Sequence, residues 1–175
     1  TTFINCTSLY NLTIDSANQY YEIVDGIIYK KDMSSLIILA TMSGEETVSI
    51  KEGIKVLGDG ALSICTNMKT INLPSSLETI SGNTFTGVSL LETINVSTSN
   101  QHFKAENGYL YSKDGKELIY VVPTKTSISI NSDVETIKTG SIMNKNITEL
   151  TIPNNVINME IYIFSNVTNL RSIKI

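Results

Sequence analysis

One segment of this chain occurs twice. Asn18–Asp32 returns as Asn100–Asp114, 82 positions later, and both copies open on Asn-Gln, carry Asp-Gly or Asn-Gly in the middle and end on Lys-Asp. Because self-similarity at a fixed period is the mark of a repeat architecture, this feature favours a solenoid over other fold classes. The duplication predicts two modules, at about residues 18–96 and 100–175.

A shorter period is visible in pairs of apolar residues spaced i, i+2, each of which is typical of a short strand with one buried face. Most successive pairs follow at nearly equal intervals, whereas the intervals from Ile14 to Ile50 and from Val96 to Ile130 are clearly longer. This spacing predicts seven short parallel strands on one face of the coil. The pairs are Leu12/Ile14, Val48/Ile50, Ile71/Leu73, Ile94/Val96, Ile128/Ile130, Leu150/Ile152 and Ile173/Ile175.

The two long turns each contain one copy of the duplicated segment. Asp25-Gly26 and Asn107-Gly108 stand between β-rich runs, which is the strongest short-range signal for a hairpin. A further turn at Lys113–Lys116 predicts a third antiparallel strand. We expect two antiparallel β-flaps, at about residues 18–42 and 100–124, that project from the opposite side or the rim of the coil.

The remaining arcs are crowded with Thr, Asn and Ser, and each is too short for a stable helix of three turns. They are expected to contain a second short extended piece and then irregular, 3₁₀ or short helical structure. The predicted fold class is therefore a repeat solenoid with parallel strands on one face, such arcs, and two antiparallel β-hairpin insertions.

The phasing of these residues resembles one known family. Pro74 through Val96 and Pro153 through Ile175 share the frame Pro-x-x-[Leu/Val], then Phe, then Leu-x-x-Ile-x-[Val/Ile], and Cys6-Thr-Ser-Leu9 and Cys65-Thr-Asn-Met68 precede two of the strands. This frame looks like the BspA-like leucine-rich repeat of bacterial or protist surface proteins, and the inserted hairpins are similar to those of bacterial members. Ile142 stands where the family usually has Phe. The resemblance implies a secreted or cell-surface protein associated with adhesion.

Composition fits one domain that spans residues 1–175. The chain is 41% hydrophobic and 17% charged, which is enough apolar content for a continuous core. Its 13 basic and 17 acidic residues give a net charge of −4, which argues against a nucleic-acid partner. No apolar run approaches the ~20 residues that span a membrane. Neither end carries a capping repeat, so we expect a fragment of a longer array.

Residue types that often carry chemistry have simpler interpretations here. Cys6 and Cys65 share one phase of the repeat, where a small buried hydrophobe is expected, and no histidine spacing accompanies them to indicate zinc. His102 is the single histidine and is aligned with Tyr20 of the other copy, which does not fit a general base. Glu45-Glu46 and Asp15 lie in polar corners. We therefore predict no catalytic residue, no cofactor and no metal site.

Two groups of residues remain as candidates for binding a protein or glycan ligand. Alternation directs a set of small polar side chains outward from the strands, and this set is Asn11, Thr13, Thr47, Ser49, Thr70, Asn72, Thr93, Asn95, Ser127, Ser129, Glu149 and Thr151, continued by Ser172 and Lys174. The flaps hold six of the eight tyrosines, of which the candidate contacts are Tyr20, Tyr29, Tyr109 and Tyr111. The opposing interpretations are that Ser and Thr simply suit exposed strands and that the tyrosines cover the core.

The predicted function is a non-catalytic interaction module at the cell surface or outside the cell. The alternative is a structural spacer that displays another domain. Buried tyrosine rings would favour the spacer.

Overall fold

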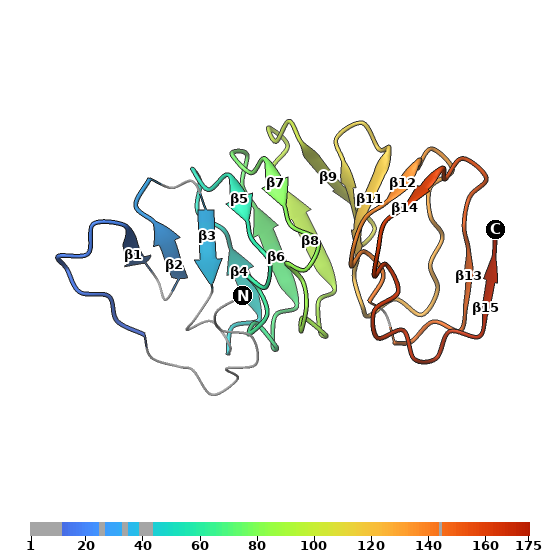
Figure 1. Cartoon of the computed structure of the whole chain (residues 1–175), viewed down its shortest axis with the longest axis horizontal. Helices are drawn as coiled ribbons and strands as arrows, with labels where there is room; N and C mark the ends of the chain where they lie inside the picture. The colour runs from blue at the N-terminus through green and yellow to red at the C-terminus, as the bar shows by residue number, and fades with distance from the viewer. Residues whose placement is uncertain (1–11, 25–26, 33–34, 39–43, 144) are drawn as a thin grey trace.

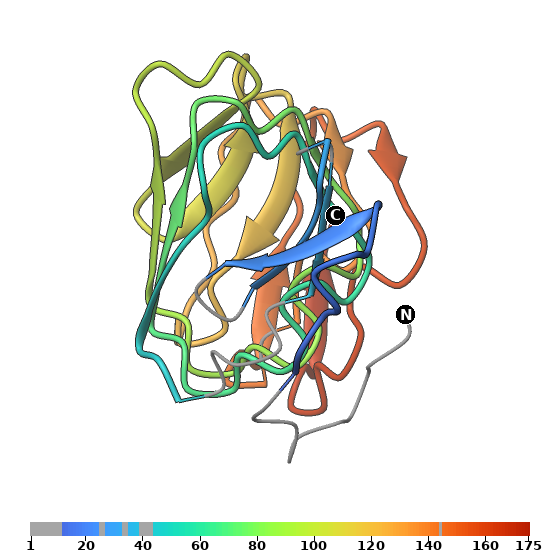
Figure 2. The same ribbon diagram turned by 90° about the vertical axis from the view of Figure 1, so that its left-hand side faces the viewer.

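The computed structural model of the chain describes residues 12–24, 27–32, 35–38, 44–143 and 145–175. The described chain winds into an elongated coil whose short strands stand side by side along its length (Figure 1). Viewed along that length, successive turns superpose around a shared interior (Figure 2). The predicted solenoid is confirmed.

The apolar pairs form parallel strands on one face, as their spacing predicts. Ile71 pairs with Ile94 and Leu73 with Val96 on adjacent parallel strands. The strands of this face form a three-stranded and a two-stranded sheet, namely β4 (Thr47–Ser49), β6 (Thr70–Leu73) and β8 (Thr93–Val96), then β13 (Glu149–Thr151) and β15 (Ser172–Lys174). One parallel bridge between Ser129 and Thr151 adds the segment around Ile128–Ile130 to the second sheet. The prediction of a seventh strand at Leu12/Ile14 is wrong, because both residues lie in irregular structure outside the strands.

The opposite face carries the second extended piece of each turn. These strands are two residues long, and they are β5 (Val56–Leu57), β7 (Thr79–Ile80), β12 (Thr136–Ile137) and β14 (Asn158–Met159). They pair in parallel from one turn to the next, β5 with β7 and β12 with β14.

The duplicated segments form the two three-stranded antiparallel inserts that the hairpin signals predict. The first consists of β1 (Tyr21–Val24), β2 (Ile27–Lys30) and β3 (Ser35–Ile38), and the second of β9 (Phe103–Glu106), β10 (Tyr109–Ser112) and β11 (Glu117–Val121). Both central residues of the Asn107-Gly108 turn have positive φ, 51° and 80°, as a type I′ hairpin requires. Asp25-Gly26 lies outside the described residues.

The prediction that the inserts project from the coil is wrong. The last strand of each insert pairs in parallel with the strand of the next turn, β3 with β5 and β11 with β12, so each insert belongs to a five-stranded sheet of the solenoid. In the end-on view the first insert crosses the opening of the coil (Figure 2). The inserts are therefore internal walls.

The second insert separates two hydrophobic cores, because both of its faces are apolar. One face contributes Phe103, Leu110, Tyr120 and Val122 to the core of the first module. The other contributes Tyr109, Tyr111, Leu118 and Val121 to the core of the second module. The first insert repeats this arrangement, with Ile27 and Tyr29 on the core of the first module and Ile28 packed with Ile64 on its other side.

This wall explains why the strand face is split into two sheets. The insert lies between the two cores, so no described strand pairs with β8 on the side of the second module. The backbone N–H of Ser129 donates instead to the Tyr109 hydroxyl, with N and O 2.8 Å apart. A tyrosine of the wall thus supplies a hydrogen bond to the first strand segment of the second module.

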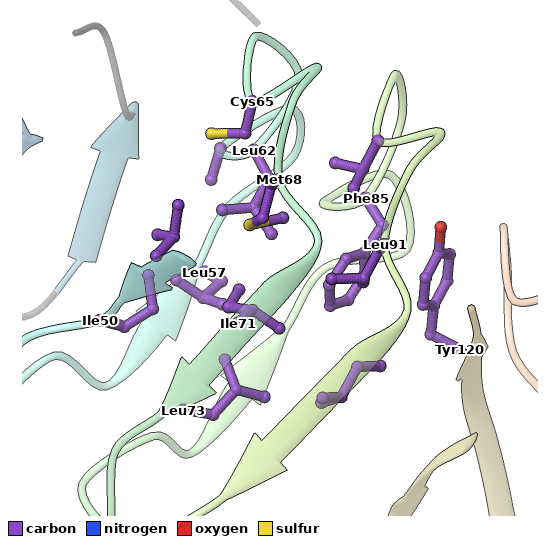
Figure 3. Packing of buried hydrophobic residues seen from close by; sticks show 14 of the residues in the cluster. Ile50, Leu57, Leu62, Cys65, Met68, Ile71, Leu73, Phe85, Leu91 and Tyr120 are labelled. Carbon is purple, nitrogen blue, oxygen red and sulfur yellow. The ribbon is translucent and has the colours of Figure 1, made fainter. Parts of the chain in front are cut away.

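The core of the first module consists of inward residues from three turns and from the wall. Figure 3 shows Leu57, Ile71 and Leu91 in this core, with the Phe85 ring facing the wall residue Tyr120. The two rings stack with centroids 4.2 Å apart and planes 14° from parallel. Burial of these side chains supplies the main driving force for stacking one turn on the next.

The arcs contain no helix in the described part of the chain, so the 3₁₀ or short helical structure that we expected there is not found. Between β5 and β6 the chain makes consecutive turns, with Ser63 N donating to Gly60 O, Cys65 N to Leu62 O and Met68 N to Cys65 O. These i, i+3 hydrogen bonds satisfy backbone N–H and C=O groups within isolated turns. A helix would need a longer series of consecutive hydrogen bonds.

Asn100 anchors the second insert to the turn that precedes it. Its side chain is fully buried. The amide nitrogen donates to the carbonyls of Pro74 and Leu77, at 2.8 and 3.0 Å, while the amide oxygen accepts from the backbone N–H groups of His102 and Phe103, at 2.8 and 2.7 Å. Both hydrogens and both lone pairs of the carboxamide are therefore used.

Candidate functional site

The outward polar side chains of the strand face stand in register as two parallel rows in each sheet, and we call the whole set the polar ladder. On β4, β6 and β8 the buried residues Val48, Ile71 and Ile94 alternate with polar residues that are exposed or half-buried. The described residues of the polar ladder are Thr47, Ser49, Thr70, Asn72, Thr93, Asn95, Ser127, Ser129, Glu149, Thr151, Ser172 and Lys174. Thr13 is exposed but outside the strands, and Asn11 lies outside the described residues.

Hydrogen bonds run along the polar ladder from strand to strand. The Asn95 amide nitrogen donates to the Asn72 amide oxygen at 2.9 Å, and the Asn72 nitrogen donates to the Ser49 hydroxyl oxygen at 2.8 Å. The repeat period places these side chains one above the other, because the strands are in register. The row is therefore held in one orientation rather than being a set of independent side chains.

Ion pairs flank this row. Lys69 Nζ lies 2.7 Å from Glu46 Oε1, and the hydrogen bond to Glu46 raises the pKa of Lys69. In the next corner Glu52 accepts hydrogen bonds from Ser75 and Ser76, which lower the pKa of its carboxyl group. The Glu52 carboxyl group is therefore ionised at neutral pH. Because these groups are exposed or half-buried at the surface, their contribution to stability is small.

The second part of the polar ladder borders a shallow depression. Its volume is about 310 Å³, and Ser127, Ile128 and Thr148–Thr151 are among its lining residues. The polar residues of this part carry hydroxyl groups, together with the Glu149 carboxylate and the Lys174 ammonium group. No side chain of the described polar ladder is aromatic.

Three of the four candidate tyrosines belong to the core, so the prediction that they form contacts on a projecting flap is wrong. Tyr29, Tyr109 and Tyr111 are 1%, 8% and 6% exposed. Burial, with Tyr109 stacked beside it, raises the pKa of Tyr111 to about 12. Tyr20 is 74% exposed and remains available at the surface.

The thiol of Cys65 is buried in the first core, where the sequence predicts a small hydrophobe. Cys6 lies outside the described residues. Burial raises the pKa of Cys65 to about 12. The Cys65 thiol is therefore neutral at neutral pH, and the thiolate is the reactive form.

We expect Cys65 to resist alkylation in the folded protein. In a Cys6→Ser variant, iodoacetamide at pH 8 should modify Cys65 about a thousandfold more slowly than in the urea-unfolded chain, because the thiolate fraction falls tenfold per unit of pKa. Mass spectrometry of timed samples measures both rates. Equal rates would show that Cys65 is exposed.

His102 is exposed and lies next to Phe103, with ring centroids 6.3 Å apart. Substituting His102→Tyr copies the residue of the other module and should change the free energy of unfolding by less than about 0.5 kcal/mol, as is usual for surface positions. Urea denaturation of both proteins measures this difference. Any activity found for the parent protein should persist in the variant, and its loss would assign a functional role to the imidazole.

Among the described residues, no group of three or more His, Cys, Asp or Glu side chains is placed to hold a metal ion. In the same part of the chain, no helix has the length and apolar character needed to cross a membrane.

Comparisons with known proteins agree with this architecture. Residues 120–175 match the family model for the BspA type leucine rich repeat region (6 copies). The sequence matches no curated protein.

Solved structures of bacterial proteins share the fold. The pneumococcal vaccine antigen PcpA aligns with a TM-score of 0.62 and 20% identity over 74% of this chain. A leucine rich cell surface protein from Faecalibacterium prausnitzii aligns with a TM-score of 0.56 and 21% identity over 74% of this chain. A leucine-rich repeat protein from Eubacterium ventriosum aligns with a TM-score of 0.50 and 16% identity over 90% of this chain and 70% of its own.

The alignments cover 39% of the PcpA chain and 41% of the Faecalibacterium chain. This chain therefore spans about two fifths of the length of these two structures. The strand spacing, the hairpin inserts and the family match lead to the same assignment. Residues 120–175 match the model of the BspA-type leucine-rich-repeat family, and the described chain as a whole has the leucine-rich-repeat solenoid fold.

Proposed function

We propose that this chain is a non-catalytic interaction module of a cell-surface or extracellular protein, and that the polar ladder contacts a protein or glycan ligand. The observation that supports this most directly is the hydrogen-bonded row Asn95–Asn72–Ser49. An ordered row of amides and hydroxyls loses little side-chain entropy when a ligand binds to it. Amides and hydroxyls can also pair with sugar hydroxyls or with a peptide backbone.

The family match and two structural neighbours, a vaccine antigen and a cell surface protein, support a surface location. The exposed imidazole of His102 and the buried, neutral thiol of Cys65 support a non-catalytic role, since among the described residues neither side chain is hydrogen-bonded to a group that would activate it.

The test is binding of the purified chain to an array of glycans and extracellular-matrix proteins. A ladder variant, Asn72→Ala with Asn95→Ala, should lose at least about tenfold in affinity for an array ligand, because it removes two ordered carboxamides. The matched control is Thr136→Ala with Asn158→Ala, which changes polar residues on the opposite strand face. Equal binding of the two variants would contradict the proposal.

A structural spacer is the second candidate, and the burial of Tyr29, Tyr109 and Tyr111 favours it. These rings fill the interior where the inserts cross the coil. A spacer would give no array signal that depends on the polar ladder. The same experiment therefore separates the two functions.

A further inference from the structure

A groove lies where the two modules meet on the face of the two-residue strands. Its volume is about 460 Å³. One wall is Glu78–Asn83, which includes β7, and the other is formed by Glu117 and Ile119 of β11 with Lys138 and Thr139. Figure 1 shows β7 and β11 on either side of this junction. At one end the modules touch, because a Cβ added to Gly140 would lie 2.4 Å from the Gly82 carbonyl oxygen.

The edge of β7 that faces the second module is unpaired in the described chain. In other turns the backbone carbonyl at the equivalent position is hydrogen-bonded to the next turn. Leu57 O accepts from Ser81 N at 2.9 Å, and Ile137 O accepts from Glu160 N at 3.0 Å. Ile80 is the residue that pairs with Leu57 and so occupies the same position one turn later, but β7 is the last strand of its sheet. Because strand pairing alternates along the backbone, the N–H and C=O of Ile80 are directed to this open edge.

The side chain of Ile80 also lacks the cover that its counterparts have. Leu57 and Ile137 are the inward residues of β5 and β12, and both are fully buried. Ile80 is only half-buried, and it lines the groove with Phe85, Phe103 and Ile119. The groove thus combines an apolar floor with the open edge of a strand.

The rim of the groove is acidic. Asp59, Glu78, Glu117 and Glu160 line it with one cation, Lys138, and Lys55 beside the groove pairs with Glu78 at 2.9 Å, so these four carboxylates and two ammonium groups carry a formal charge of −2. Lys138 Nζ lies 2.6 Å from Glu160 and 3.8 Å from Glu117, so its charge is already shared between two carboxylates. An incoming chain would therefore meet negative potential.

We propose that this groove binds an extended, basic segment of a partner protein. The segment adds a strand parallel to β7, pairs with the backbone of Ile80, places apolar side chains on the floor and directs Lys or Arg side chains to the acidic rim. A second copy of this chain fits less well, because the chain itself has a net charge of −4. Unpaired strand edges are the usual sites for such β-strand addition.

The test uses a fluorescein-labelled peptide, acetyl-Lys-Ile-Lys-Val-Lys-Thr-amide, titrated with the protein and followed by anisotropy. Nitrogen-15 NMR of the protein reports the position of binding. We expect saturable binding, shifts centred on Glu78–Gly82, and affinity that falls as salt is added. A peptide of the same pattern with Glu in place of Lys should bind at least about tenfold more weakly, because charge complementarity is lost.

Two further comparisons separate strand addition from general attraction of charge. The variant Glu78→Lys with Glu117→Lys should lose at least about tenfold, whereas Glu92→Lys, which changes an exposed carboxylate outside the groove, should stay within about twofold. N-methylation of the peptide backbone should also weaken binding at least about tenfold, because it removes donors for the β7 carbonyls. The N-methylation comparison uses the unaltered protein and is therefore independent of the folding of any variant.

Several outcomes would overturn the proposal. They are no binding at about 1 mM peptide, equal binding of the N-methylated peptide, shifts outside the groove, or self-association of the protein through β7 in place of peptide binding. The ladder variant Asn72→Ala with Asn95→Ala should bind this peptide like the parent protein. Failure of the groove proposal is therefore distinguishable from failure of the proposed function.

Discussion

Replacing Asn100 by alanine is expected to lower the free energy of unfolding by about 3–5 kcal/mol, since a buried polar group that loses its partner costs about 1–3 kcal/mol. The substitution removes hydrogen bonds to the carbonyls of Pro74 and Leu77 and from the N–H groups of His102 and Phe103. Urea denaturation followed by circular dichroism measures the loss.

The duplication supplies a matched control. Asn18 is the equivalent residue, and among the described residues its side chain accepts hydrogen bonds from the exposed N–H groups of Tyr20 and Tyr21 and donates none to a neighbouring turn. Asn18→Ala should therefore cost less than about 1 kcal/mol. Equal losses for Asn100→Ala and Asn18→Ala would show that the buried carboxamide has no anchoring role.

The second large effect is expected at Tyr120, the wall residue that stacks on Phe85. Tyr120→Ala should cost about 3–5 kcal/mol, because it leaves a cavity at the boundary of the first core. Burial raises the pKa of the Tyr120 phenol above its ordinary value, and its hydroxyl finds no hydrogen-bond partner among the described residues.

Tyr120→Phe keeps the ring and removes that hydroxyl. We expect this variant to match the parent protein or to exceed its stability by up to about 1 kcal/mol, because burial of a hydroxyl without a protein partner is unfavourable. Thermal and urea unfolding of both variants provide the measurement. Destabilisation by Tyr120→Phe as large as that by Tyr120→Ala would show that the hydroxyl, and not the ring, holds the wall.

The strand positions could be predicted from the sequence because their signal is local. Ile71 and Ile94 are inward-facing residues with polar neighbours on both sides in the sequence. The regular spacing of such residues is typical of stacked turns. The Asn107-Gly108 turn was predictable for the same reason, since two positive φ angles favour those residue types. The described arcs contain turns and no helix. The Thr- and Asn-rich sequence of these arcs is compatible with either structure, so the sequence alone could not distinguish turns from a short helix.

The placement of the inserts could not be predicted from their hairpin signals, which specify turns but not what packs on each face. A signal was nevertheless present in Tyr109-Leu110-Tyr111 and Leu118–Val122, where apolar residues occupy both strand faces. Such runs are typical of strands buried on both sides.

The candidate site was predicted in part. Alternation correctly placed the described strand residues of the polar ladder outward, although the wall divides the row into two. The tyrosines were misplaced because amphipathic rings suit both a surface and a crowded core. The role of Asn100 was missed, although the presence of Asn at the same position in both copies was the available signal.

Hydrogen–deuterium exchange of the free chain tests most directly whether the inserts are internal walls. If the second insert is a wall between two cores, the paired amides of β10 and β11 should exchange as slowly as those of β6. In that case the amides of all three strands exchange only when the solenoid itself unfolds. The exposed residue Asn107 at the hairpin tip should exchange fast and serves as the internal reference. Exchange of β10 and β11 as fast as that tip, with β6 still protected, would show that the insert is a separate projecting flap and would contradict this account.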